Sequence, residues 1–172
     1  MAAEQGITHP TVAAPETTGV YVEGLRAGLA GAVTIAVWFF VLDAIRGRPL
    51  YTPTVLGLAL FRQGAGLANP AAITPNFDMV MSFTWVHLLA FLLIGIAASR
   101  LIGLIERNPN LGFGVVIFAT FFEFGFLLAC MVFAEPVLHV LAWSEVLIGN
   151  LLAAAAMAFV FWRRHPRLVI LP

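Results

Sequence analysis

The sequence predicts an all-α integral membrane protein, a bundle of four transmembrane helices with a short interfacial helix in its outer loop. Of its 172 residues, 61% are hydrophobic and only 10% are charged, whereas a soluble domain is roughly 45–50% apolar and about 25% charged. Four apolar runs reach the roughly 20 residues that a helix needs to cross a bilayer. Proline, glycine and asparagine separate these runs. One small soluble core could not bury this much apolar surface, so we expect a single membrane bundle.

The four transmembrane spans are predicted at residues of about 19–44, 79–102, 112–134 and 143–162. Together they form one transmembrane domain over residues 19–165, followed by a short C-terminal tail at 166–172. A polar tail at residues 1–18 precedes the first span. A cleaved signal peptide has a positively charged region before its apolar stretch, and this tail has no basic residue. We therefore interpret it as a tail and not as a signal.

The outer loop, residues 45–78, is the one sizeable segment outside the predicted spans. Thr52 followed by Pro53 is typical of an N-cap with proline at the first helical position, and Gly64 is a helix stop signal. We expect a short apolar helix from Pro53 to Gln63 at the outer interface, followed by an extended Pro/Asn-rich segment. Two interpretations stay open, a plain connecting loop or a docking surface for a partner.

The arginine distribution predicts the orientation. With four spans, both termini and the loop between spans two and three share one side. That side carries six arginines: Arg26, Arg100, Arg107, Arg163, Arg164 and Arg167. The other side carries three: Arg46, Arg48 and Arg62. Cytoplasmic loops are enriched in basic residues, so we expect both termini to be cytoplasmic. The many arginines and alanines, with no lysine, indicate a bacterium, and hence its inner membrane.

Two ionisable residues lie deep inside predicted spans, His87 and Glu123, and with Asn150 they form the candidate site. At 1.5 Å per residue, their depths from the nearer interface are about 12, 16 and 10 Å. Spans two and three are joined by a short turn and must be antiparallel neighbours. We therefore expect His87 and Glu123 to meet, and Asn150 can join them.

Three interpretations of this intramembrane cluster stay open, because a buried ionisable group is costly unless it has a partner. The first is a structural hydrogen bond that fixes helix packing. The second is a proton or ion relay through Glu123 and His87. The third is ligation of a haem or (bacterio)chlorophyll by His87. No phosphate loop, zinc-ligand spacing or Ser–His–carboxylate set is present, so no catalytic residue and no metal site is predicted.

Small residues at helical spacing predict close helix packing in two spans. Gly24, Gly28 and Ala32 lie four residues apart in span one, and span four carries a comparable stripe at Gly149, Ala153, Ala156 and Met157. Such stripes let the backbones of two helices approach closely. The sequence leaves open whether the neighbour belongs to this bundle or to a partner.

Two segments carry a resemblance. The run from Gly47 to Pro53 and the closing run from Trp162 to Pro166 resemble small four-span bacterial membrane proteins. This likeness covers the whole chain and implies the fold without assigning chemistry. In size and character the chain also resembles accessory subunits of bacterial photosynthetic and respiratory complexes.

The combined expectation is a non-enzymatic accessory or structural subunit of a larger bacterial membrane complex, of the energy-transducing kind that the resemblance implies. Its partners would be membrane lipid and other membrane subunits. Nucleic acid is not expected, because nine basic residues balance nine acidic ones. Any cofactor contact would be with lipid or (bacterio)chlorophyll. The alternatives are a small transporter or proton-conducting protein using Glu123 and His87, and a pigment- or haem-binding subunit with His87 as ligand.

Overall fold

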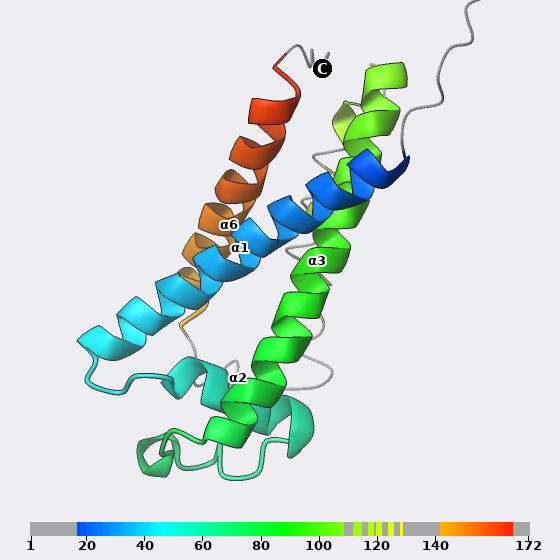
Figure 1. Ribbon diagram of the computed structural model, residues 1–172. Helices are drawn as coiled ribbons and strands as arrows, with labels where there is room; N and C mark the ends of the chain where they lie inside the picture. Colours follow the sequence, from blue (N-terminus) through cyan, green and yellow to red (C-terminus); the bar gives the residue numbers. More distant parts are fainter. Residues whose placement is uncertain are drawn as a thin grey trace, which may run out of the picture.

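The computed structural model describes residues 17–108 and 142–166, together with scattered positions between 112 and 128. Regular structure in this part of the chain is helical, without strands (Figure 1): α1 (Thr17–Ile45), α2 (Tyr51–Phe61), the 3-10 turn η1 (Pro70–Ala72), α3 (Phe77–Arg107) and α6 (Trp143–Arg164). Helices α1, α3 and α6 are long and apolar enough to cross a membrane. The all-helical, membrane-type character predicted from composition is thereby confirmed.

The predicted spans at 19–44, 79–102 and 143–162 lie within α1, α3 and α6. Helix α3 continues to Arg107, which makes it about 46 Å long at 1.5 Å per residue and longer than the roughly 30 Å hydrocarbon core. The predicted span at 112–134 falls mostly outside the described residues. Its few described positions between 113 and 128 are helical, and the span as a whole stays a prediction.

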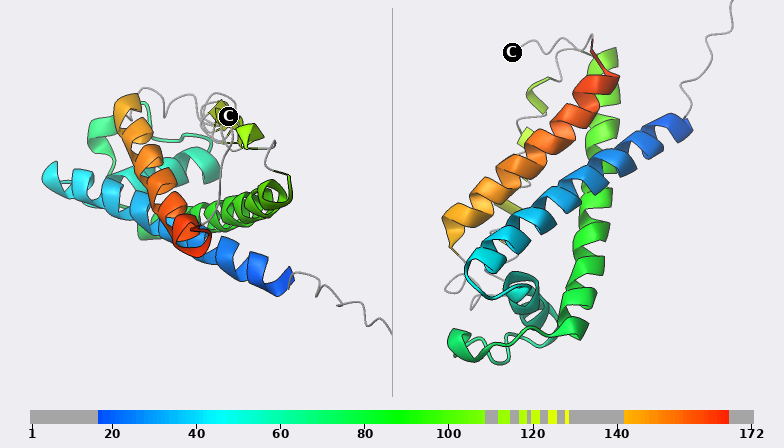
Figure 2. Two further views of the ribbon diagram at one scale, coloured as in Figure 1. Left: turned by 90° about the horizontal axis from the view of Figure 1, so that it is seen from above. Right: turned by 60° about the vertical axis from the view of Figure 1, so that its left-hand side comes forward.

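Helix α1 is the central element, because it packs against each of the other three helices. It crosses α3 obliquely, and α6 lies beside it (Figures 1 and 2). A buried cluster at the junction of α1, α3 and α6 forms the main core: Ala27, Ala32, Phe91, Ala153, Met157 and Phe161. We call the end of the bundle at Glu23 and Glu106 the tail end, and the end at Asp43 and α2 the loop end.

Glycine contacts fix the crossing of α1 over α3. A Cβ added to Gly24 would lie 2.6 Å from the Cα of Ile96, and a Cβ on Gly28 would overlap the carbonyl oxygen of Phe91. On the facing helix, a Cβ on Gly95 would overlap the backbone of both glycines. The two backbones therefore touch, as small residues permit in membrane helix pairs. The small-residue stripe of the first span packs within the bundle.

The start of α2 differs from the sequence prediction. The helix begins at Tyr51, after Leu50 in the left-handed conformation (φ 66°), so Thr52 is not its N-cap. The Thr52 N–H instead donates to Asp43 Oδ2 at 2.7 Å, and its hydroxyl donates to Asp43 Oδ1 at 2.8 Å. A helix leaves its first N–H groups without internal partners. Here the carboxylate at the end of α1 supplies the acceptor, so Thr52 can lie inside the first turn.

Helix α2 lies across the loop end, against α1 and α3 (Figure 2). Its apolar side chains form a second buried cluster with the segment that follows: Val55, Ala59, Leu67 and Ile73. Gly57 brings α2 against the backbone of α3 at Met79. The helix predicted after the first span is confirmed at Tyr51–Phe61, and Gly64, with φ 76°, follows its end as expected. The segment after it, predicted to be extended, instead forms turns and η1. The position of α2 at a membrane interface stays a prediction.

Candidate functional site

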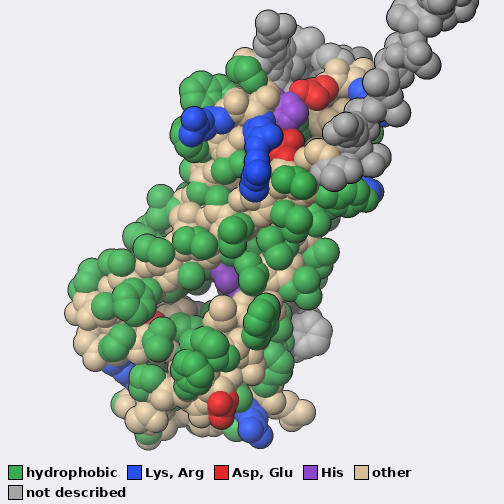
Figure 3. Space-filling view, viewed as in Figure 1, with side chains coloured by type: hydrophobic (Ala, Val, Ile, Leu, Met, Phe, Trp, Pro, Cys, Tyr) green, Lys and Arg blue, Asp and Glu red, His purple; other side chains and the backbone are tan. Residues whose placement is uncertain are grey.

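A cavity of about 680 Å³ lies between the helices near the loop end. It arises because α1 and α3 touch at the glycine crossing and diverge from there toward the loop end, where α2 closes the space (Figures 1 and 2). The walls come from α1, the α2 region and α3, with a contribution from α6. The space-filling view shows a hollow on this face, with a histidine side chain inside it (Figure 3).

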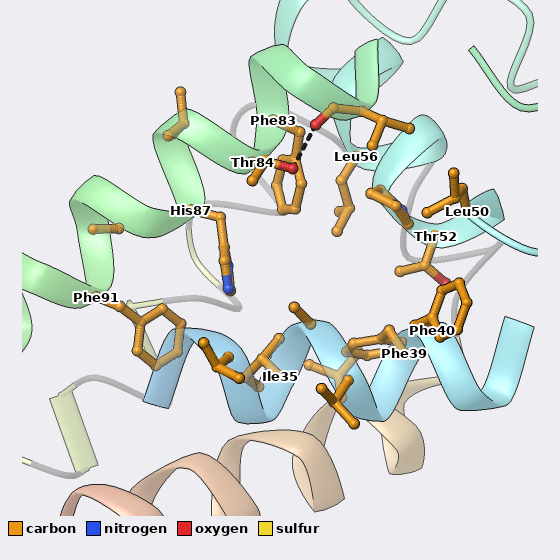
Figure 4. A pocket seen from close by; sticks show the side chains of 18 of the residues that line it. Ile35, Phe39, Phe40, Leu50, Thr52, Leu56, Phe83, Thr84, His87 and Phe91 are labelled. Carbon is orange, nitrogen blue, oxygen red and sulfur yellow. Dashed lines mark hydrogen bonds between the residues drawn. The ribbon is translucent and has the colours of Figure 1, made fainter. Parts of the chain in front are cut away.

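The described residues of the cavity wall are almost all aliphatic or aromatic, and four of them have polar side chains: Thr52, Thr84, His87 and Asn150. The Thr84 hydroxyl donates to the carbonyl of Val80 at 2.7 Å (Figure 4). The Thr52 hydroxyl donates to Asp43, as described above. Asn150, which is buried, has an interaction partner of its own. The polar groups of the wall are therefore bound to the protein.

His87 points from α3 toward α1, between Phe83 and Phe91 (Figure 4). Its Nε2 lies 3.1 Å from the carbonyl oxygen of Ala32. A carbonyl only accepts hydrogen bonds, so Nε2 carries the hydrogen and donates it. The ring centroid of Phe91 lies 4.8 Å from that of His87. His87 thus ties α3 to α1 at the narrow side of the cavity.

This hydrogen bond bears on cofactor binding. An imidazole nitrogen ligates iron or magnesium through its lone pair, and the other ring nitrogen then donates its N–H. At His87 the Nε2 position is occupied by the hydrogen donated to Ala32. Ligation through Nε2 would require His87 to break its bond to α1. The bond joins α3 to α1, and it is compatible with ligation through Nδ1 but not through Nε2.

The predicted intramembrane cluster is placed only in part. His87 and Asn150 line the same cavity, from α3 and α6 respectively. Glu123 lies outside the described residues, so its meeting with the other two stays a prediction. The sequence could not identify Ala32 as the partner of His87, because every residue carries a backbone carbonyl.

A second group of polar side chains, which the sequence analysis missed, lies at the loop end. Asp43 is 1% exposed and binds Thr52. Arg46 forms an ion pair with Glu145 of α6, with Nη1 2.9 Å from Oε2, and Trp38 Nε1 donates to the Glu145 carbonyl at 2.9 Å. The hydrogen bond to Glu145 holds the pKa of Arg46 above its ordinary value. One signal was available in the sequence: Asp43 lies at the end of an apolar span, three residues before Arg46.

A third group joins three helices at the tail end. His165, just after α6, places Nε2 2.8 Å from Glu23 Oε1 of α1, and Nδ1 bonds Glu106 of α3. Ser99 adds a bond from its hydroxyl to the Val20 carbonyl at 2.9 Å. The His165 ring thereby joins the end of α6 to both α1 and α3. Glu23 and His165 are 142 residues apart in sequence, and no local pattern predicts their contact.

The polar groups were also compared with metal-binding arrangements, and the chain with known proteins. Among the residues that the structure describes, no three His, Cys, Asp or Glu side chains are arranged to hold a metal ion. The tail-end group is connected through the imidazole ring and does not surround a common point. Comparisons with protein-family models, curated proteins and solved structures found no match to this chain.

Proposed function

We propose that this protein is a non-catalytic accessory subunit of a larger membrane assembly. The observation that carries the proposal is that polar groups inside the helix bundle form hydrogen bonds between its elements. Four of the groups described above each join one helix to another element: His87 to α1, Ser99 to α1, Asp43 to α2, and Trp38 to α6. Groups bound in this way hold the fold together, which supports a structural role.

The outward surface supports association with other subunits. In the most apolar stretches of α1 and α3 only 22% of the residues are buried, and in that of α6 33% are buried. A large part of each helix is therefore at least partly exposed and available to lipid and to neighbouring membrane proteins. Transmembrane helices associate through close packing of such surfaces. The proposal that the host complex is energy-transducing is based on the sequence resemblance alone.

We also propose that the chain crosses a bacterial inner membrane four times, with both termini cytoplasmic. The tail end carries exposed arginines at five described positions: Arg26, Arg100, Arg107, Arg163 and Arg164. At the loop end, Arg46 binds Glu145 and Arg48 donates to the Ile73 carbonyl at 3.1 Å. The larger, solvent-accessible set of positive charges is therefore at the tail end, which supports its cytoplasmic placement.

Cysteine labelling on intact cells tests this orientation. In a Cys130→Ala background, a cysteine introduced at Gln63 should react with a membrane-impermeant maleimide, and one at Ala3 should react only after the cells are opened. Gln63 is an exposed position just after α2, which makes it a suitable reporter. Labelling at Ala3 but not at Gln63 would reverse the orientation.

The mass and colour of the natively isolated chain test the subunit proposal. After gentle solubilisation of native membranes, the tagged chain should migrate in a particle much larger than its own 18.6 kDa plus detergent, with partner subunits in fixed stoichiometry. A small, monodisperse particle without partners would contradict the proposal. A visible absorption band that follows the isolated chain would favour the pigment- or haem-binding alternative.

A further inference from the structure

The cavity between α1, α2 and α3 has the size and surface of a binding site. Its volume of about 680 Å³ lies within the range of roughly 300–1,000 Å³ that is typical of small-molecule sites. We propose that it binds one hydrocarbon chain, an acyl chain of a bilayer phospholipid, which enters sideways from the membrane. This ligand site is independent of the role as a subunit.

The chemistry of the wall selects a hydrocarbon. The hydrogens of Thr52, Thr84 and His87 are donated to Asp43, Val80 and Ala32, and Asn150 also has a partner. A ligand carbonyl would lose its hydrogen bonds to water and find the hydrogens of Thr52, Thr84 and His87 already engaged, which is unfavourable. An unbranched hydrocarbon has no such groups to satisfy, and it gains contact with the apolar wall.

The exposed wall residues indicate that the ligand enters the cavity from the membrane. Several wall residues are also exposed on the outer surface, including Val33 (52% exposed) and Val37 (55%) of α1 and Leu60 (45%) of α2. On α3, Val86 is 41% exposed at the same cavity. The rim is therefore apolar, on helices whose outward surface suits acyl chains. Among the described wall residues, this rim gives an acyl chain a path from the bilayer into the cavity that crosses no polar side chain.

The shape of the cavity suits a single chain. The glycine crossing of α1 and α3 and the His87–Ala32 bond close the cavity on one side. Figure 4 shows Thr52 and Leu56 of α2 on the side opposite His87. The aromatic rings of Phe39 and Phe83 face the space from opposite helices (Figure 4). An acyl chain lying between these rings would make the dispersion contacts that the diverging helices cannot make with each other.

Photocrosslinking tests the proposal on the full chain in nanodiscs. The probe is a phosphatidylethanolamine with a diazirine in one acyl chain, and adducts are mapped by peptide mass spectrometry. Adducts should concentrate on the wall residues of α1, α2 and α3. Ala90→Phe, which places a ring in the cavity, should reduce these adducts several-fold. Ala97→Phe, an exposed position on the same helix outside the cavity, is the matched control and should leave them unchanged.

Two results would overturn the proposal. One is an even spread of adducts over all exposed helix faces that Ala90→Phe does not change. The other is preferential capture of a diazirine-labelled prenyl chain, which would assign the cavity to an isoprenoid tail. If Ala90→Phe does not fold, Ala36→Phe on the facing wall of α1 replaces it. Native mass spectrometry of the wild-type chain needs no variant: one retained phospholipid per chain is expected, and none would contradict the assignment.

Discussion

His87 and Asp43 illustrate how single polar residues act in an apolar chain. Each lies in a long apolar helix, and each binds backbone of another element, His87 at the Ala32 carbonyl and Asp43 at the Thr52 N–H. In a membrane such bonds contribute modestly, on average about 0.6 kcal/mol in helix bundles. Their value lies in fixing how one helix is placed against the next, because an unpaired polar group would be costly there.

Replacing His87 by phenylalanine separates its ring from its hydrogen bond. The new ring keeps the aromatic contacts with Phe83 and Phe91 and loses the bond to Ala32. We expect a loss of about 0.6 kcal/mol in the free energy of unfolding, measured in mixed micelles. His87→Gln, which retains a donor, should lose less. Loss of a visible absorption band in His87→Phe would contradict the structural role and favour a pigment ligand.

Asp43 should matter more, because it satisfies two donors of one buried residue. Asp43→Ala leaves the N–H and hydroxyl of Thr52 without their acceptor, and Thr52 is only 3% exposed. Buried groups left without partners cost about 1–3 kcal/mol. The expected result is destabilisation of this size, with faster amide exchange in the first turn of α2. Asn at position 43 keeps one acceptor and should be milder. Wild-type stability in Asp43→Ala would contradict the account.

At the scale of helices, much of the structure follows from sequence. Long apolar runs and proline or glycine breaks predicted α1, α3 and α6 nearly to their ends, because membrane helices must satisfy their backbone internally. The predicted start of α2 was wrong, because the acceptor for the Thr52 N–H is the carboxylate of Asp43, nine residues earlier. The stripe of Gly24 and Gly28 predicted a close contact but not its partner, Gly95, because a single sequence shows which faces are small and not which faces meet.

The glycine crossing gives a prediction at this scale. Gly95→Ala should destabilise the protein by about 1–3 kcal/mol, the usual cost of overpacking, because the added methyl overlaps the backbone of α1. Gly103→Ala on the same helix has no atom within 4 Å of the added Cβ. It should be neutral or stabilising by up to about 1 kcal/mol, from helix propensity alone. Equal effects of the two substitutions on unfolding would show that the helices do not cross at Gly95.

At the scale of the whole molecule, three polar groups hold the bundle at different levels. The pair Arg46–Glu145 joins α1 to α6 at the loop end, His87 joins α3 to α1 inside, and His165 joins three helices at the tail end. From the sequence, His87 was identified but not its partner Ala32, and the groups at both ends were missed. The end contacts link residues 59 to 142 positions apart, which periodicity and capping rules do not detect.

The central claim is that intramembrane polar groups serve structure and assembly. It is tested most directly by His87→Phe and Glu123→Gln in native membranes, measured as host-complex activity per assembled complex. The account predicts that each variant assembles with its partners and that this ratio equals that of the wild type. A normal amount of assembled complex with abolished activity in Glu123→Gln would contradict it and assign the chain to proton conduction.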